Sequence, residues 1–405
     1  MIWTIIMAGG LGSRFWPISN TDCPKQFVDA MGIGKSMLQI TFERYAKICR
    51  KENIVVVTGE AYADRVREQL PELSDYQVLS EPLRRNTAPC VAYAASVIAQ
   101  MDPEATLIVT PSDHAVFRQE KFLTDLRQAI DTVQKHEWIV ILGAQPVRPD
   151  TSYGYIQFKE PKAPSVDKLK DDQLISSNNS KATRQPILPG SFGATACDQR
   201  GANLSTNQPT NLFEVVTFTE KPPVEMARQF IASGEFFWNA GIFVWTLPVL
   251  RKAYEAFLPA IAESFFGLTA ETPREELERI YSQCEAISVD NGIMEQASNV
   301  HVLAASFGWS DVETWESLYD VMRHDRNGNA ILSGNVFTYD TKNTLVMMPN
   351  DPGKTVVLEG LDGYIVAANE DTLMVCRREK EERIFRFSND VEMKRLIDKK
   401  GSKKQ

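Results

Sequence analysis

A glycine-rich turn followed by two basic residues is the strongest candidate for chemistry in this chain. The apolar run Trp3–Ala8 leads directly into Gly9–Ser13, and Arg14 and Lys25 follow. Because glycine lacks a Cβ atom, its backbone N–H groups can approach an anion closely and the turn can adopt positive φ without strain. A strand, a glycine loop and two cations therefore predict a site that holds a polyphosphate.

The spacing of this loop excludes two common nucleotide motifs. The Gly-x-x-x-x-Gly-Lys-Ser/Thr pattern is absent from it. Phe15 stands where the third glycine of the dinucleotide fingerprint should be, which excludes a NAD-dependent dehydrogenase. For the loop taken alone, a tight strand-to-helix turn is an equally good interpretation.

Two aspartates offer ligands for a metal ion. Asp113 follows the predicted strand Leu107–Thr110, and Asp311 lies far away in the sequence. Mg²⁺ prefers one or two carboxylates together with phosphate oxygens and water. For an isolated aspartate at a strand end, an Asx turn is an equally good interpretation.

Alternating strand-like and helix-like segments must position these residues. Apolar runs predict strands at Trp3–Ala8, Ile54–Thr58, Leu107–Thr110 and Ile139–Leu142, with helices at Ser36–Arg50, Ala61–Leu70, Ala88–Gln100 and Lys121–His136. This order predicts an α/β fold with a Rossmann-like mixed, mostly parallel sheet covered on both faces. Ligands bind beyond the carboxyl ends of such strands, so we expect the glycine loop and Asp113 at one edge.

Two later regions differ in composition. Residues 161–211 are rich in Ser, Asn, Thr, Pro and Lys, which predicts a disordered insertion. From about residue 327, short alternating runs separated by Gly, Asn and Asp predict a small β-rich domain. We therefore expect one domain at 1–326, interrupted by the insertion, and a second at 327–405.

Composition narrows the class of protein. The chain has 405 residues, of which 24% are charged, and a formal net charge of −9, which argues against a general nucleic-acid binder. Its six cysteines form no Cys-x-x-Cys pair and favour reduced thiols. No run approaches the roughly 18 apolar residues of a membrane span, and the N-terminus shows no signal segment. We expect a soluble, cytoplasmic protein.

The order of the motifs resembles the sugar-nucleotide pyrophosphorylases, and within them the mannose-1-phosphate guanylyltransferases. The motifs that carry the resemblance are Gly9–Ser19, Pro24–Phe27, Glu81–Pro89, Pro111–His114, Tyr153–Ile156, Glu220–Pro222, Trp238–Phe243 and Gly308–Trp315. They span essentially the whole chain outside the insertion. The resemblance implies the short form of the family, without an isomerase domain, and a β-helix-like C-terminal domain.

The resemblance further implies the transfer of GMP from GTP to α-D-mannose 1-phosphate, with Mg²⁺ as cofactor and GDP-mannose and pyrophosphate as products. The sugar phosphate would attack the α-phosphorus in line, without a general base, because a phosphate dianion is itself a competent nucleophile. The expected partners are GTP and mannose 1-phosphate, with neither nucleic acid nor membrane. The oligomeric state, including a homodimer, is left open.

Individual residues receive roles from the same resemblance. Arg14 and Lys25 are the expected catalytic cations, and Asp113 and Asp311 the expected metal ligands. Expected nucleotide-binding residues are Ala8, Gly9, Gly10, Gly12, Ser13, Glu81, Arg85, Asn86 and Thr87. Expected sugar-phosphate-binding residues are Gly154, Glu220, Lys221, Asn239 and Asp290. His114 is expected to orient Asp113 or its loop rather than act as a base. Asn86 or Thr87, taken alone, predicts a helix N-cap.

Two positions depart from the family pattern. Glu313 replaces a glycine close to Asp311, and Gln296 stands where the family often has a lysine. Two alternatives are weighed against the catalytic interpretation: a related hexose-1-phosphate nucleotidyltransferase with another nucleotide or sugar, and a non-catalytic regulatory subunit that senses GDP-mannose. The presence of the predicted cations and carboxylates favours the enzyme.

Overall fold

The computed structural model describes residues 1–10, 13–159, 211–349, 351 and 353–402. The predicted insertion at 161–211 therefore lies outside the described residues, except for its last position, Asn211. Within the described ranges, every helix is too short or too polar to cross a membrane.

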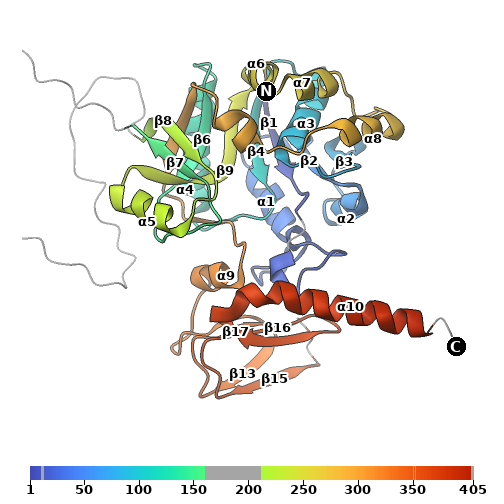
Figure 1. Ribbon diagram of the computed structural model, residues 1–405, viewed down its shortest axis with the longest axis vertical. Helices are drawn as coiled ribbons and strands as arrows, with labels where there is room; N and C mark the ends of the chain where they lie inside the picture. Colours follow the sequence, from blue (N-terminus) through green and yellow to red (C-terminus); the bar gives the residue numbers. More distant parts are fainter. Residues whose placement is uncertain (11–12, 160–210, 350, 352, 403–405) are drawn as a thin grey trace, which may run out of the picture. The chain divides into compact units, whose positions relative to one another are not determined.

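Strands and helices alternate through most of the chain (Figure 1). The strands are β1 (Ile2–Met7), β2 (Ile54–Gly59), β3 (Val78–Glu81), β4 (Thr106–Pro111), β5 (Ala115–Val116), β6 (Ile139–Ala144), β7 (Tyr155–Phe158), β8 (Leu212–Thr219), β9 (Phe236–Thr246), β10 (Val300–Ala305) and β11 (Trp309–Ser310). The helices are α1 (Met37–Tyr45), α2 (Ala63–Gln69), α3 (Thr87–Met101), α4 (Gln119–Val133), α5 (Val224–Ser233), α6 (Leu247–Phe257), α7 (Pro259–Phe265), α8 (Arg274–Gln283) and α9 (Trp315–Val321).

Nine of these strands form one mixed sheet in the order β3-β2-β1-β4-β9-β6-β10-β8-β7. The first four strands in this order are parallel to one another, and β6 is parallel to β10. The long strand β9 runs antiparallel between β4 and β6. The predicted mixed α/β sheet is confirmed, and the four predicted strands match β1, β2, β4 and β6 to within two residues at each end.

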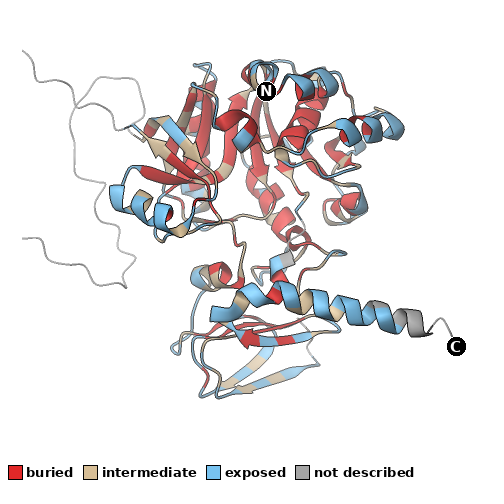
Figure 2. Cartoon of the chain, viewed as in Figure 1, coloured by how far each residue is buried: buried red, intermediate tan, exposed pale blue. Residues whose placement is uncertain are grey.

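Helices cover both faces of the sheet, because successive strand residues point to opposite sides. Trp3 and Ile5 of β1 pack in one apolar cluster with residues of α3, α6 and α7. Ile6 packs in a second cluster with residues of α1, α2 and α4. Figure 2 shows the buried residues concentrated on these strands. The expectation of a sheet buried on both faces is confirmed.

Short strands follow α9, as predicted from residue 327 onward. They are β12 (Ala330–Ser333), β13 (Asn335–Tyr339), β14 (Leu345–Met347), β15 (Thr355–Glu359), β16 (Tyr364–Ala368) and β17 (Leu373–Arg377), and a helix, α10 (Ile384–Ser402), comes after them. Strands β12, β14, β16 and β17 form one sheet, and β13 pairs with β15. Leu332 and Ile365 share an apolar cluster with Phe15, Trp16 and Trp315. These strands therefore contribute to the packing of the N-terminal loop.

Candidate active site

The glycine loop and the segment 111–114, here called the aspartate loop, leave neighbouring strands. Met7 at the end of β1 pairs in parallel with Pro111 at the end of β4. The backbone N–H of Ser112 donates to the carbonyl oxygen of Met7 at 3.0 Å. The expectation that both loops lie at the carboxyl edge of the sheet is confirmed, and this is the edge where α/β sheets bind ligands.

Gln26 holds the backbone of the glycine loop. Its side chain is 1% exposed. Its Nε2 donates to the carbonyl oxygens of Ala8, at 2.9 Å, and Gly10, at 3.0 Å. Gly12 lies outside the described residues, and Ser13 begins a short 3-10 turn that contains Arg14. Gln26 was not predicted as a site residue, although the motif Pro24–Phe27 pointed to this segment.

Lys25 joins the two predicted metal ligands. Its ammonium nitrogen lies 2.9 Å from Oδ2 of Asp113 and donates to the carbonyl oxygens of Asp311, at 2.7 Å, and Val312, at 2.9 Å. The residue is 3% exposed. An ammonium group has three donors, so all three have acceptors in the protein. Lys25 therefore holds together two segments that are distant in the sequence.

A short ladder explains how these two segments meet. Strand β5, directly after the aspartate loop, pairs antiparallel with β11, so that Ala115 lies opposite Ser310. Asp311 is the next residue, and its Oδ1 accepts a hydrogen bond of 2.8 Å from the hydroxyl of Tyr153. Asp113 and Asp311 thus both lie beside Lys25. Tyr153 belongs to a motif singled out in the sequence but was not predicted as a site residue.

The acidic groups of this cluster differ in protonation. Burial acts to raise the pKa of Asp113, but the charge of Lys25 and its hydrogen bond outweigh it and hold that pKa below its usual value. Burial raises the pKa of Asp311 to about 6, against the opposing effects of Tyr153 and Lys25. Asp113 is therefore ionised at neutral pH, and Asp311 ionises just below it.

His114 is a neutral, fixed side chain. Burial lowers its pKa to about 4, although Asp113 acts in the opposite direction. The indole Nε1 of Trp309 donates to Nδ1 of His114 at 3.1 Å. An imidazole that accepts at Nδ1 carries its proton at Nε2. This geometry fits a side chain that orients the aspartate loop.

The two aspartates fit the requirements of a hard metal ion. Within the described residues, no group of three or more His, Cys, Asp or Glu side chains could hold a metal by itself. Mg²⁺ commonly takes only one or two carboxylates, and phosphate oxygens and water complete its shell. Asp113 and Asp311 are carboxylates of the kind that such a site requires, and their role as metal ligands stays a prediction.

The five predicted sugar-phosphate residues lie together. The backbone N–H of Asn239 donates to the carbonyl oxygen of Gly154 at 2.8 Å, and its Nδ2 donates to Oδ1 of Asp290 at 2.8 Å. The ammonium of Lys221 lies 3.3 Å from Oε1 of Glu220. A Cβ atom at Gly154 would lie 2.6 Å from Oε2 of Glu220. Glycine at this position is therefore what lets the Glu220 carboxylate take its place.

The predicted nucleotide-binding segment at 81–87 is held by protein contacts. Asn86 caps α3, because its Oδ1 accepts from the N–H of Thr87 at 2.9 Å, which confirms the N-cap prediction. Nε of Arg85 donates to the carbonyl oxygen of Tyr281 at 2.7 Å. The hydroxyl of Tyr281 in turn donates to Oε1 of Glu81 at 3.2 Å.

Glu81, the one acidic residue of this segment, has a strongly raised pKa. It is 7% exposed, and burial raises its pKa to about 8 despite the hydrogen bond from Tyr281. Its Oε2 would lie 3.8 Å from a Cβ atom placed on Gly9. A neutral carboxyl group therefore faces the glycine loop.

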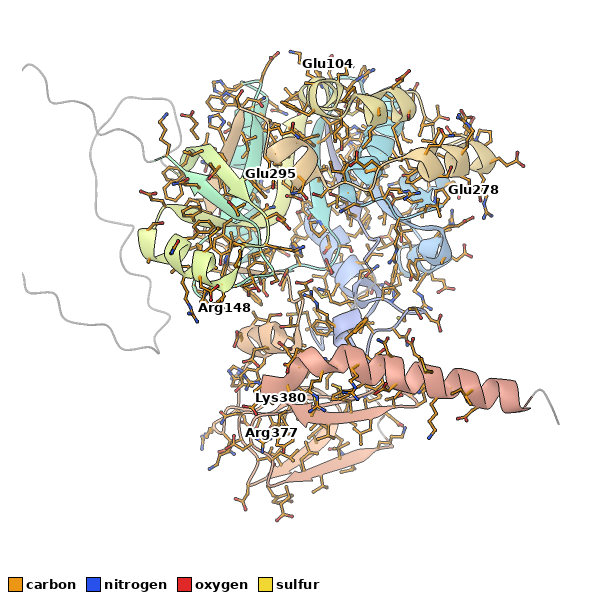
Figure 3. The ribbon with its side chains drawn as sticks, in the orientation of Figure 1. Glu104, Arg148, Glu278, Glu295, Arg377 and Lys380 are labelled. Carbon is orange, nitrogen blue, oxygen red and sulfur yellow. The ribbon has the colours of Figure 1, made fainter. Side chains whose placement is uncertain are left out.

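A polar cavity of about 530 Å³ opens beside Asp311. Its lining includes Arg14, Tyr153, Lys221 and Asp311, so residues predicted for both halves of the site share one space. Arg148, labelled in Figure 3, lines the same cavity and was not predicted from the sequence.

Arg14 does not face this cavity as a free cation. Its Nη1 lies 2.7 Å from Oε2 of Glu313, the residue that replaces the family's glycine. Both side chains are partly exposed, at 56% and 38%.

Comparison with known families completes the assignment. The family model described as Nucleotidyl transferase matches residues 3–171 and 188–328. The chain belongs to the nucleotidyl transferase family. The matched residues include both aspartates, Lys25 and all of the mixed sheet except Ile2.

Named relatives refine the place of this nucleotidyl transferase. It is 28% identical to the alginate biosynthesis protein AlgA of Pseudomonas aeruginosa, over 96% of this chain and 72% of that protein. It is 29% identical to the mannose-1-phosphate guanylyltransferase ManC of Salmonella typhimurium, over 93% of this chain and 70% of that protein. These relatives confirm the resemblance inferred from the motifs.

A solved structure agrees with this placement. The nucleotidyl transferase superposes on the crystal structure of mannose-1-phosphate geranyltransferase from Thermus thermophilus with a TM-score of 0.77 and 26% identity. The superposition covers 96% of this chain and 99% of that chain.

Proposed function

We propose that this chain transfers GMP from GTP to α-D-mannose 1-phosphate, giving GDP-mannose and pyrophosphate. One observation carries the proposal: Lys25 ties Asp113 and Asp311 together at the carboxyl edge of the sheet, next to the glycine loop. Relatives named mannose-1-phosphate guanylyltransferase support it over 93% and 94% of the chain.

The protein's part in the reaction is to bring two anions together and to neutralise charge. The sugar-phosphate oxygen attacks the α-phosphorus in line, and pyrophosphate leaves on the opposite side. Arg14 and the glycine-loop amides bind the departing β- and γ-phosphates, and Lys221 binds the phosphate of the sugar. Donors fixed before the reaction starts lose little free energy to reorganisation, so they stabilise the transition state effectively.

Asp113 and Asp311 would hold the Mg²⁺ ion. When bound, the ion supplies charge neutralisation at the phosphate oxygens. Lys25 holds the Asp311 backbone and the Asp113 carboxylate in position relative to each other. It also carries a positive charge close to the reacting phosphates. Tyr153 orients the Asp311 carboxylate through the hydrogen bond to its Oδ1.

Two further groups of side chains would select the sugar and the base of the substrates. Glu220, Asn239 and Asp290 would bind hydroxyls of mannose. Glu81 and Arg85 would complement the polar edges of guanine. At neutral pH the protonated Glu81 carboxyl offers one donor and one acceptor, which suits a base that carries both.

The organisation of the chain forms part of the proposal. Residues 1–326 would carry the chemistry, and residues 327–405 would form a β-helix-like domain, in which β12, β14 and β16 pair in parallel and β13 pairs in parallel with β15. We expect the enzyme to work in the cytoplasm. A homodimer stays an open prediction.

Pyrophosphate release tests the function. The protein with Mg²⁺ is supplied with each ribonucleoside triphosphate and dTTP, crossed against mannose, glucose and N-acetylglucosamine 1-phosphates. We expect release mainly from GTP with mannose 1-phosphate. Release mainly from a different pair of nucleotide and sugar phosphate would contradict the proposed specificity. It would support a related hexose-1-phosphate nucleotidyltransferase. Binding of GDP-mannose without any turnover would contradict the proposal and support a regulatory subunit.

A further inference from the structure

One face of α1 is bonded to the chain around the aspartate loop. The hydroxyl of Thr41 donates to the carbonyl oxygen of Ser112 at 3.0 Å, and the hydroxyl of Tyr45 donates to Oγ1 of Thr110 at 2.9 Å. Both pairs are buried. Residues three and four apart lie on the same face of a helix, so Arg44 lies on this face as well.

Arg44 completes the contact. Its Nη1 and Nη2 both donate to the carbonyl oxygen of His114, each at 3.4 Å. The three side chains thus reach positions 110, 112 and 114, on both sides of Asp113. We name Thr41, Arg44 and Tyr45 the α1 clamp.

Burying the charged side chain of Arg44 at this position costs folding free energy. The residue is 4% exposed, and burial lowers its pKa. Among the residues that the structure describes, no carboxylate forms an ion pair with it. A buried charge without a counter-ion destabilises the folded state. The guanidinium carbon of Arg44 also lies 5.9 Å from the centroid of the Phe122 ring, a cation–π contact that offsets part of this cost. The two bonds to the aspartate loop point to a role besides folding stability.

Other contacts hold the two ends of the loop and its side chains. Asp113 extends its carboxylate towards Lys25, and His114 is held by Trp309. On the sheet side, the N–H of Ser112 is bonded to Met7. The α1 clamp fixes the carbonyl oxygens immediately before and after Asp113. Without it, the peptide groups on either side of Asp113 lose these bonds, and the backbone between β4 and β5 has more freedom to move.

We propose that the α1 clamp positions Asp113 for the reaction, with Arg44 as its central positioning residue. The inference rests on the proposed function, because it assigns Asp113 to the reacting centre. Arg44 acts through the loop backbone and does not touch the substrate.

Arg44→Met tests the positioning role, since methionine fills much of the space and removes both donors. We expect kcat to fall by roughly 10- to 100-fold, because a shift of about 1 Å in a positioned group has effects of this size. The KM for GTP should stay within about threefold of wild type, because ground-state binding of the nucleotide does not use Arg44. Arg44→Lys should recover part of kcat.

A second measurement needs no substrate. Hydrogen–deuterium exchange of peptides covering residues 110–117 should be faster in Arg44→Met and Thr41→Val than in wild type, with peptides from β2 unchanged. Thr132→Val is the matched control, because Thr132 is a buried residue whose hydroxyl donates to the carbonyl oxygen of Gln128 at 2.8 Å, and it lies at the end of α4 away from this loop. It should leave exchange of the loop and kcat unchanged.

The outcomes separate the two claims. Wild-type exchange of the loop and wild-type kcat in folded Arg44→Met protein would overturn the clamp. A lower melting temperature with unchanged kcat and exchange would show a merely structural arginine and also overturn it. If Arg44→Met does not fold, Thr41→Val and Tyr45→Phe decide by the same readouts. Failure of the wild type to turn over any substrate pair would contradict the proposed function, while the exchange measurement would still decide whether the clamp holds the loop.

Discussion

Lys25 and Asp113 form an ion pair of 2.9 Å at the carboxyl edge of the sheet, and the lysine is the more buried partner, with a side chain 4% exposed against 30%. The remaining two donors of Lys25 are bonded to backbone carbonyls of the Asp311 segment. The lysine thus belongs to the framework of the site as well as to its charge.

Lys25→Met should therefore affect both activity and stability. We expect kcat to fall by roughly 10²-fold, because Lys25 fixes the Asp113 and Asp311 segments and a misplacement of about 1 Å can have an effect of this size. The free energy of unfolding should fall by roughly 1–3 kcal/mol, because Asp113 and two carbonyls lose their partner and Asp113 is partly solvated. Urea unfolding and steady-state kinetics measure the two effects. Lys35→Met, which removes an exposed pair with Glu43, is the control. Wild-type kcat in folded Lys25→Met would remove Lys25 from the mechanism.

Glu313→Gln should improve nucleotide binding. In the structure the Glu313 carboxylate is bonded to Arg14, so phosphates must displace it. Exposed pairs are worth roughly 0–1 kcal/mol, and we expect the KM for GTP to fall by up to about fivefold with little change in kcat. The gain should shrink as salt concentration rises, since salt screens exposed charges. Glu43→Gln should show no such gain, and an unchanged or higher KM in Glu313→Gln would contradict competition for Arg14.

Glu81 should make stability depend on pH. Its pKa is about 8 in the folded protein and about 4.5 when unfolded, so the folded state binds the proton more tightly. The stability contribution is complete below pH 4.5 and is lost as pH rises through 8. Between pH 5 and 8 the wild type should lose roughly 2–4 kcal/mol that Glu81→Gln retains.

Urea unfolding at these two pH values measures the Glu81 effect. Glu104→Gln, at an exposed glutamate labelled in Figure 3, controls for loss of a carboxylate. If Glu81→Gln and wild type lose stability in parallel, Glu81 does not take up its proton in this range.

Gly154→Ala should disturb sugar-phosphate binding more than folding. The added Cβ atom would meet the end of the flexible Glu220 side chain at 2.6 Å and displace it. We expect the KM for mannose 1-phosphate to rise by roughly tenfold, about the effect of losing one hydrogen bond to a charged group. The added Cβ atom would also lie 3.2 Å from the Phe218 ring, so we expect a small fall in the melting temperature. Gly59→Ala, whose Cβ would find only an ordinary contact of 3.6 Å with Tyr62, is the control. An unchanged KM would remove Glu220 from the sugar site.

The local pattern of apolar residues in the sequence was sufficient to predict much of the fold. The predicted strand at Ile54 begins where β2 begins, because a run of buried valines leaves little choice. Strand β9 was not predicted, since Asn239 and Gly241 interrupt its apolar residues. Helix α10 was not predicted either, because Phe385 and Met393 are exposed and its apolar residues do not mark one buried face.

The site could be predicted in its residue types but not in its connections. Asp113 was found from its place after a strand, whereas its association with Asp311 came only from family resemblance. The partners of Gln26 and Lys25 are mainly backbone carbonyls, which every residue offers, so no side-chain pattern in the sequence marks them. The α1 clamp went unnoticed because Thr41 and Arg44 are ordinary residues of an amphipathic helix until the loop opposite them is known.

The ladder between β5 and β11 has a consequence for refolding. It consists of two residue pairs and joins parts of the chain that lie about 195 residues apart, as Trp309 and His114 do. Closing so long a loop is entropically unfavourable, and contacts of this kind form slowly. After dilution from denaturant, helical signal should return first, and turnover should return only when these distant segments have joined.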